Sequence, residues 1–219
     1  MALTKVIGEG VGSLGTSSLT HGSDSGDTRF TLNSANQYTM VIKKAGDIAG
    51  QIGGGGADVL RFSNAAGATI MEMNAGQITM PLQPAFLVQA TAVSNLGLNA
   101  DHTIAFGTEV FDNNSDFASN VFTAPVTGKY QFNLSVRIDN LDDATAYYMV
   151  QIRTSNRDIQ TIHGNSGYDA DVVYMSLNIS ALVDMDAGDT SKAIIGVPST
   201  GSAQADLHNV TRFSGYLVA

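Results

Sequence analysis

The sequence contains no cysteine and no tryptophan, and charged residues make up only 14% of its 219 residues. The absence of cysteine excludes a disulfide framework and any metal site built on thiolates. Soluble domains usually carry about 25% charged residues, so uncharged glycine, serine, threonine and asparagine must supply much of the polarity here. These residue types suit β-structure, tight turns and burial against other chains. A cysteine-free chain also fits assembly in a reducing cytosol.

Basic residues are scarce as well, with 11 Lys and Arg against 20 Asp and Glu and a net charge of −9. Nucleic-acid binding needs clustered basic side chains, and the sequence has no such cluster, so we expect no nucleic-acid partner. The first residues lack the apolar stretch of a signal peptide. No apolar run approaches the roughly 18 residues of a membrane span, so we also expect no membrane insertion.

No arrangement of residues typical of catalysis is present. The four histidines, at positions 21, 102, 163 and 208, show no metal-ligand spacing and accompany no nucleophile motif. The glycine run at 53–56 lacks the Lys-Ser/Thr that a phosphate-binding loop requires, so it predicts a turn. We therefore predict no catalytic residues, no cofactor-binding residues and no enzymatic activity.

Acidic loops are the remaining candidates for ligand binding. Asp139, Asp142 and Asp143 lie around the end of a long predicted strand, and a second group of acidic and amide residues spans 112–116. Oxygen-rich loops can bind Ca²⁺, but neither loop has EF-hand spacing or a Glu that could bind in a bidentate manner. We interpret both as solvated turns and keep Ca²⁺ at Asp139, Asp142 and Asp143 as the alternative.

Residues 1–28 are rich in Gly, Ser and Thr and have few large apolar side chains. Such a segment cannot bury enough apolar surface to offset its ordering entropy. We predict an extended arm that anchors the protein to a larger particle; the alternative is an arm folded back on its own domain. The apolar residues available for anchoring are Leu3, Val6, Ile7, Val11, Leu14 and Leu19.

Residues 29–80 read as short strands separated by turns. The predicted strands are 29–32, 38–42, 59–62, 69–73 and 77–80, with turn sequences around 64–67 and 74–76. Strands this short form weak hairpins alone. We therefore expect this β-rich stalk to gain stability by pairing of strands between three chains.

From residue 81 onward, after the prolines at 81 and 84, the strands become longer. Residues 129–138 alternate without interruption between apolar and polar side chains, which predicts a half-buried antiparallel strand. Similar patterns include Tyr148, Val150 and Ile152, and the row Val173, Met175, Leu177 and Ile179. No segment has helical periodicity, so we predict an all-β fold with one domain over residues 81–219.

Three segments of this domain resemble the globular head of complement C1q. Residues 122–132 read Phe-Thr-Ala-Pro-Val-Thr-Gly-Lys-Tyr-Gln-Phe, residues 186–189 read Asp-Ala-Gly-Asp, and residues 213–218 read Phe-Ser-Gly-Tyr-Leu-Val. They follow the order of that family and cover about residues 84–219. The core and fold signature residues are Phe122, Pro125, Gly128, Tyr130, Phe132, Phe213, Gly215 and Tyr216.

The resemblance implies a ten-stranded jelly-roll β-sandwich that assembles as a homotrimer, related in shape to tumour necrosis factor. The chain departs from the animal family because it lacks collagen repeats and cysteine. A second resemblance lies upstream: residues 78–86, Ile-Thr-Met-Pro-Leu-Gln-Pro-Ala-Phe, are similar to the junction between shaft and knob in many bacteriophage fibre proteins.

Together these features predict a trimeric phage protein on the virion surface, made in the host cytoplasm. The role we favour is capsid decoration, as a cement protein or head fibre that binds the major capsid protein. The first alternative is a short tail fibre that docks on a tail protein and recognises a glycan or protein of the host surface. The second alternative is a non-viral bacterial C1q-like protein that binds a ligand.

Overall fold

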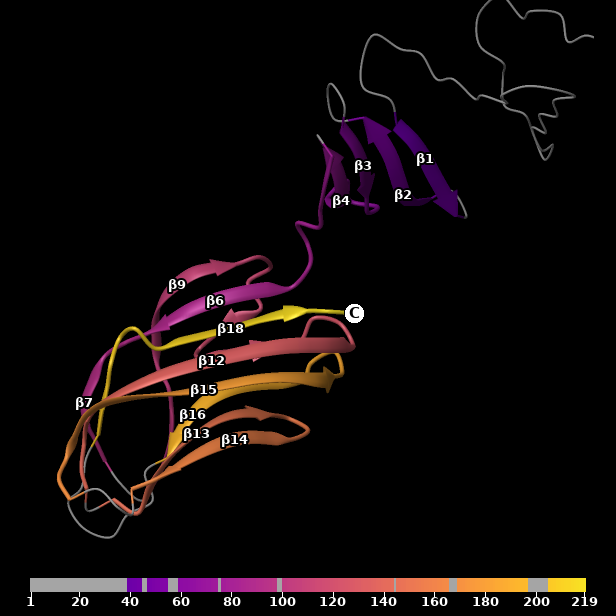
Figure 1. The fold of residues 1–219 in the computed structure, drawn as a ribbon. Helices are drawn as coiled ribbons and strands as arrows, with labels where there is room; N and C mark the ends of the chain where they lie inside the picture. The colour runs from indigo at the N-terminus through magenta and orange to yellow at the C-terminus, as the bar shows by residue number, and fades with distance from the viewer. Residues whose placement is uncertain are drawn as a thin grey trace, which may run out of the picture.

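The computed structural model describes residues 39–44, 47–54, 59–74, 76–97, 100–143, 145–165, 169–196 and 205–219. All regular elements in these ranges are β-strands, which confirms the predicted all-β class. Among them no helix offers the length and apolar character of a membrane span. Figure 1 shows a small sheet joined by a linker to a larger β-sandwich. The predicted arm over 1–28, with its six anchoring residues, and the predicted strand 29–32 lie outside the described residues.

The small sheet is an antiparallel meander whose strand order follows the chain. Each strand pairs with its neighbour in the same chain, so the pairing between chains that we expect is restricted to the edge strands β1 and β5. The connections are only a few residues long, so neighbouring strands meet at little cost in loop-closure entropy. The strands are β1 (Thr39–Lys44), β2 (Asp47–Gly54), β3 (Val59–Ser63), β4 (Thr69–Asn74) and β5 (Gln77–Thr79).

The prediction of a turn over the whole glycine run 53–56 is also wrong in part. Gly53 and Gly54 belong to β2, a strand that the sequence patterns did not indicate. Gly53 is paired on both sides, with Thr39 of β1 and Arg61 of β3. A strand in the interior of a sheet has ladder hydrogen bonds on both edges, and these offset the entropic cost of ordering glycine.

The larger part is a sandwich of two antiparallel sheets with the strand orders β10-β11-β16-β13-β14 and β7-β17-β12-β18-β6-β9; β8 adds to β16, and β15 adds to β12. This is the predicted jelly-roll architecture. The strands are β6 (Ala85–Ala90), β7 (Val93–Leu96), β8 (Asp101–Thr103), β9 (Phe106–Asp112), β10 (Phe117–Ala118), β11 (Val121–Thr123), β12 (Gly128–Leu141), β13 (Tyr147–Thr154), β14 (Asp158–Gly164), β15 (Val172–Met185), β16 (Thr190–Gly196), β17 (Ala205–Leu207) and β18 (Arg212–Leu217).

The alternation predicted for β12 is confirmed by burial. Its inward row is almost completely buried, whereas the polar row between these residues is exposed or half-buried. In β13 the three predicted inward residues are fully buried as well. The two strands lie in different sheets, so their apolar rows form the two sides of one core. The inward row of β12 consists of Tyr130, Phe132, Leu134, Val136 and Ile138.

The row predicted in β15 is interrupted at its start. Val173 is 70% exposed instead of buried, while Val172 packs against the core. The ladder with β12 pairs Val172 with Leu141 and Tyr174 with Asp139, and Asn140 between them has a positive φ of 50°. This local irregularity breaks the simple alternation of the two faces.

Signature residues from two distant segments meet with Phe86 of β6 in an aromatic cluster at the core. The ring of Phe122 lies 5.0 Å from that of Phe86 and 5.6 Å from that of Phe132, and the ring of Phe132 lies 5.7 Å from that of Phe213. Offset and edge-to-face contacts at such distances stabilise the core beyond simple area burial. Each of these four rings is at most 1% exposed.

Two members of the signature set are exposed, and a third, Gly128, is half-buried. Tyr216 is 47% exposed, because alternation in β18 turns it away from the neighbouring buried Gly215. Pro125 is exposed in the turn between β11 and β12. The same turn carries Val126, whose carbonyl oxygen accepts a 2.7 Å hydrogen bond from the Tyr130 hydroxyl. Pro125 and Tyr216 are therefore features of the fold's turns and surface rather than core residues.

Candidate functional site

The sandwich has two distinct ends. At one end β12 begins beside the C-terminal residues: the Lys129 amide donates to the Ala219 carbonyl over 2.7 Å, and the Leu217 amide donates to the Pro84 carbonyl over 3.0 Å. The linker enters at this end, which we call the base (Figure 1). At the opposite end, which we call the free end, β12 finishes at Leu141 and the β12–β13 loop begins.

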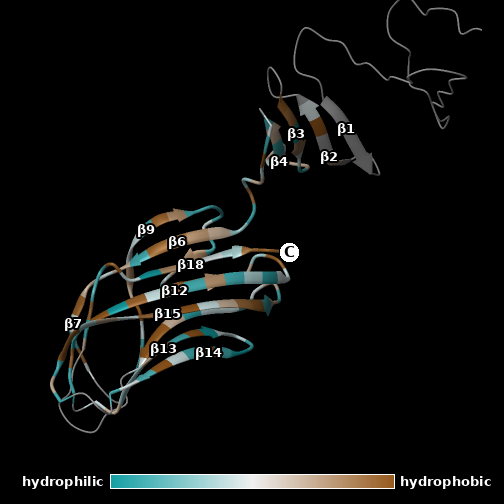
Figure 2. Cartoon of the chain, in the orientation of Figure 1, coloured by the Kyte–Doolittle hydropathy of each residue, from teal (hydrophilic) through white to brown (hydrophobic). Residues whose placement is uncertain are grey.

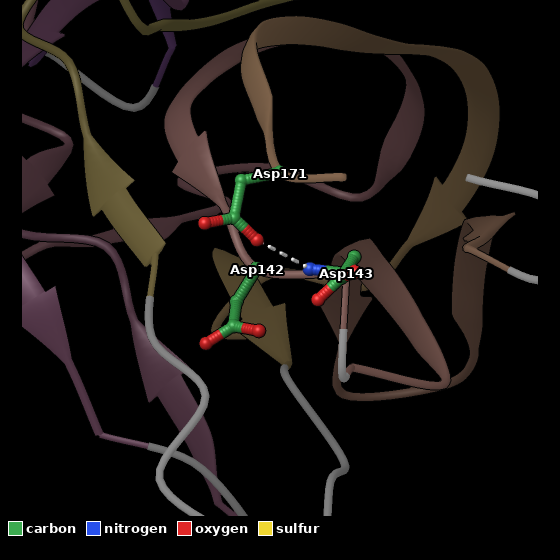
Figure 3. Close-up of side chains that lie close together, drawn as sticks. All are labelled: Asp142, Asp143 and Asp171. Carbon is green, nitrogen blue, oxygen red and sulfur yellow. Dashed lines mark hydrogen bonds between the residues drawn. The ribbon is translucent and has the colours of Figure 1, made fainter. Parts of the chain in front are cut away.

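Three acidic residues come together at the free end. One carboxylate oxygen from each of Asp142, Asp143 and Asp171 lies within 4.8 Å of the others. Asp142 and Asp143 follow β12, whereas Asp171 precedes β15, and the Asp143 amide donates a 3.0 Å hydrogen bond to the Asp171 carboxylate (Figure 3). Carboxylate oxygens in such a group are the ligand type that Ca²⁺ prefers. Asp171 was not among the residues predicted from the sequence.

Asp139, the third residue of the Ca²⁺ alternative, is not part of this group. Its carboxylate accepts two hydrogen bonds from the Arg137 guanidinium, at 2.7 and 3.2 Å. Both residues lie on the outer face of β12, two positions apart, and a strand places such residues on the same side. The Arg137 guanidinium also lies 5.1 Å from the centre of the Tyr174 ring. Asp139 therefore belongs to a surface ion pair.

Two buried polar side chains hold the β12–β13 loop in place. The Tyr148 hydroxyl accepts a 2.8 Å hydrogen bond from the Asp142 amide and lies 3.3 Å from the Thr145 hydroxyl. The Asn165 side-chain amide donates a 3.0 Å hydrogen bond to the Asp142 carbonyl. Burial raises the pKa of Tyr148 above its ordinary value, although its hydrogen bonds act in the opposite direction. The acidic loop is therefore ordered by the core beneath it.

The second predicted acidic loop, residues 112–116, has a structural role at the base. The Asp112 carboxylate accepts hydrogen bonds from the amides of Asp116, at 3.1 Å, and Phe117, at 2.8 Å. The Asn114 side chain donates to the Leu82 carbonyl in the linker over 3.0 Å. Burial raises the pKa of Asp116, and the neighbouring Asp112 adds to this effect. This loop closes on itself and holds the linker.

The outer face of the sheet that contains β15, β12 and β18 is a candidate assembly surface. Leu182, Gln131 and Tyr216 lie side by side across three strands. Leu182 is 58% exposed and Tyr216 is 47% exposed. Beside them the Gln131 amide donates to the Ser180 hydroxyl, which donates to Asn133, each over 2.9 Å. Mixed apolar and polar surface of this kind is typical of protein–protein interfaces.

His102 and His208 are hydrogen-bonded to backbone groups rather than to the acidic cluster. The His102 ring is hydrogen-bonded to the Gly97 carbonyl at 2.6 Å, and the His208 ring accepts a 3.1 Å hydrogen bond from the Val210 amide. Both contacts are with backbone groups of nearby loops. His21 lies outside the described residues.

Comparison with known proteins identifies the sandwich. The family model for the C1q domain matches residues 85–218. No curated protein sequence matches at a significant level. Among solved structures, the globular domain of zebrafish complement 1qA protein is similar with 17% identity and a TM-score of 0.46, covering 63% of this chain and 98% of that one.

Two further structures show comparable similarity. Murine APRIL at pH 5.0 has 14% identity and a TM-score of 0.45, with 62% of this chain and 99% of that chain covered. The Eiger TNF structure from S. frugiperda has 13% identity and a TM-score of 0.47, with 63% and 94% covered.

Proposed function

The chain belongs to the C1q domain family, and on that premise we propose that it is a homotrimeric structural protein of a bacteriophage virion. In this proposal residues 1–28 bind the particle and the jelly roll is displayed outward as a knob. The protein acts by binding and has no catalytic role. We favour capsid decoration, as a cement protein or head fibre, at the virion surface.

The single observation that carries this proposal is the stalk-and-knob arrangement. A C1q-type sandwich follows a narrow five-stranded sheet, and the linker between them contains the residues that resemble a phage shaft–knob junction. The linker is held firmly: the Gln83 amide side chain donates to the Leu217 carbonyl over 2.6 Å, and Asn113 donates to the Gln83 carbonyl over 3.2 Å. Such an arrangement suits a protein that presents its knob at a defined position on a particle.

The proposed trimer is supported by the outer face of β15, β12 and β18. Leu182 and Tyr216 expose large apolar surface there, although the inner face of the same sheet forms the core. Burying apolar surface contributes about 25 cal/mol per Å². The resemblance to the C1q head implies a homotrimer, and this face offers apolar and hydrogen-bonding groups for its contacts.

Attachment to particles tests the proposed anchor. Virions that lack the native copy are mixed with the protein and sedimented. We expect deletion of residues 2–28 to abolish co-sedimentation, while light scattering should still report three times the mass of the shortened chain. A variant with serine at the six apolar positions of the arm should also fail to co-sediment. The matched control, with alanine at the six serine and threonine positions between 13 and 23, should still co-sediment with the virions. Undiminished sedimentation of the deletion variant would contradict the proposal.

A second candidate function is host recognition as a short tail fibre. It is favoured by the acidic cluster at the free end, because that end lies opposite the linker and is available to a receptor. Electron microscopy of the virion distinguishes the two roles: density on the capsid shell supports decoration, and density at the tail supports host recognition. Loss of host-cell binding in an Asp143→Ala variant would also favour the second role.

A further inference from the structure

The small sheet has two chemically different faces. Residues that are directly paired across strands point to the same face, so the register assigns them. One row pairs Leu60 with Met73 and Met73 with Ile78; the next row pairs Ile52 with Phe62 and Phe62 with Met71. We call this surface the apolar face. It consists of Ile52, Leu60, Phe62, Met71, Met73 and Ile78.

The opposite face, which we call the polar face, carries hydrophilic side chains at most paired positions. Arg61 pairs with Glu72, and their side chains form a 2.6 Å ion pair. Glu72 in turn pairs with Thr79, and Asn74 pairs with Gln77. A face of this composition is stable in contact with water. The apolar face is not stable in water, since none of its six described residues carries a charged or strongly hydrogen-bonding side chain.

The apolar face has no cover within the described part of the chain. None of its six residues is buried, and none belongs to the core of the jelly roll. Leu60 and Met73 are each 40% exposed and Ile78 is 62% exposed. Hydrophobic positions are visible on β2 and β3 in Figure 2. Single-layer sheets with one apolar face need a second layer for stability.

An apolar cavity lies where the small sheet and the linker meet the base of the jelly roll. Ile70 of β4 and Met80 line a cavity of about 460 Å³ together with Leu82, Val126 and Val218. The linker forms one wall of this cavity and is hydrogen-bonded to the jelly roll. Met80, two positions after Ile78, connects the edge of the apolar face to this cavity, whereas Ile70 lies on the same side of β4 as Glu72.

We propose that the apolar face packs against the same face of two other copies of this chain, so that three small sheets enclose a common apolar core. This inference rests on the proposed homotrimer. The absence of charge on the apolar face argues against a charged partner, and identical apolar faces are complementary to one another. The polar faces then form the outside of the stalk.

The size of the face favours a copy of the chain over an independent partner. Five strands spaced about 4.8 Å apart, each about six residues long at about 3.3 Å per residue, give a face of roughly 500 Å². Independent specific interfaces bury about 800 Å² per partner. A copy already held through the jelly roll has a high effective concentration, so a small additional contact is sufficient.

Single cysteines test this packing, because the full chain has no cysteine of its own. Ile78→Cys lies on the apolar face and Thr79→Cys on the polar face of the same strand, and both residues are exposed in one chain. The rate at which each variant reacts with a maleimide probe is measured under native conditions and in denaturant. Light scattering gives the mass of the native, unlabelled variant. Met73→Cys and Asn74→Cys form a second pair on β4.

We expect a trimer mass for all four variants. The apolar-face thiols should react roughly tenfold more slowly than their polar-face partners in the native state, and equally fast in denaturant. A trimer mass with equal native rates within each pair overturns this inference and leaves the homotrimer intact. A single-chain mass overturns the homotrimer itself and this inference with it.

Discussion

Gly215 lies between aromatic rings from two neighbouring strands. It pairs with Phe132 of β12 and Phe86 of β6. A Cβ atom at this position would come within 2.5 Å of the Phe132 ring and 2.8 Å of the Phe86 ring. Glycine is therefore required here by the packing of the signature aromatics.

We expect Gly215→Ala to lower the free energy of unfolding by about 1–3 kcal/mol, because an added methyl group forces rings in a close-packed core to move. Urea denaturation followed by circular dichroism measures the change. Ser214→Ala, on the half-exposed outer side of the same strand, should change stability by less than about 0.5 kcal/mol. An equally stable Gly215→Ala variant would contradict the packing seen around this residue.

Tyr130 and Tyr148 predict how stability depends on alkaline pH. Burial raises the pKa of both hydroxyls above the ordinary value of 10.0. The folded state therefore holds these protons more tightly than the unfolded state. Their contribution is fully present below about pH 10, the unfolded tyrosine pKa, and is lost as pH rises through the folded pKa.

We accordingly expect the urea midpoint to fall as pH is raised from 9 to 11. Tyr130→Phe removes one of the titrating groups and only one hydrogen bond, to the Val126 carbonyl. Its midpoint should fall less steeply than that of the wild type over the same range. Parallel curves for the two proteins would show that Tyr130 does not contribute to the alkaline loss.

At the scale of the element, the β12–β13 loop is held by hydrogen bonds from the buried side chains of Tyr148 and Asn165. We expect Asp171→Asn, which keeps an oxygen to accept the Asp143 amide, to change stability by less than about 0.5 kcal/mol. Titration calorimetry should detect no stoichiometric Ca²⁺ binding in either protein. Stoichiometric binding in the wild type that disappears in Asp171→Asn would instead establish a cation site.

At the scale of the whole molecule, the proposed trimer contact through β15 and β18 can be separated from the fold. Leu182 is 58% exposed, so Leu182→Arg should leave the folded chain intact. In a trimer the new charge would be buried without a partner, which is strongly unfavourable. We expect light scattering to report a single-chain mass for this variant.

The matched control is Ile162→Arg, since Ile162 is 51% exposed on β14 of the other sheet. This variant should keep the trimer mass of the wild type. A trimer mass for Leu182→Arg would place the contact on a different surface of the jelly roll.

The sequence by itself determined the features that depend on the alternation of apolar and polar residues along a strand and on the residue types in turns. Strict alternation identified the buried row from Tyr130 to Ile138, and the signature segments identified the jelly roll that the structure contains. Both signals are carried by neighbouring residues, because a strand turns successive side chains to opposite faces. Turn residues around 64–67 and 74–76 likewise separated β3, β4 and β5 of the small sheet, whereas β2 was not indicated.

Only the tertiary structure decided which distant segments meet. It brought Asp171 to Asp142 and Asp143, although 28 positions separate it from Asp143. It also paired Asp139 with Arg137, and it paired the short strands of the small sheet within one chain. Such contacts depend on strand order and register, which arise from long-range packing rather than from any local pattern of residues.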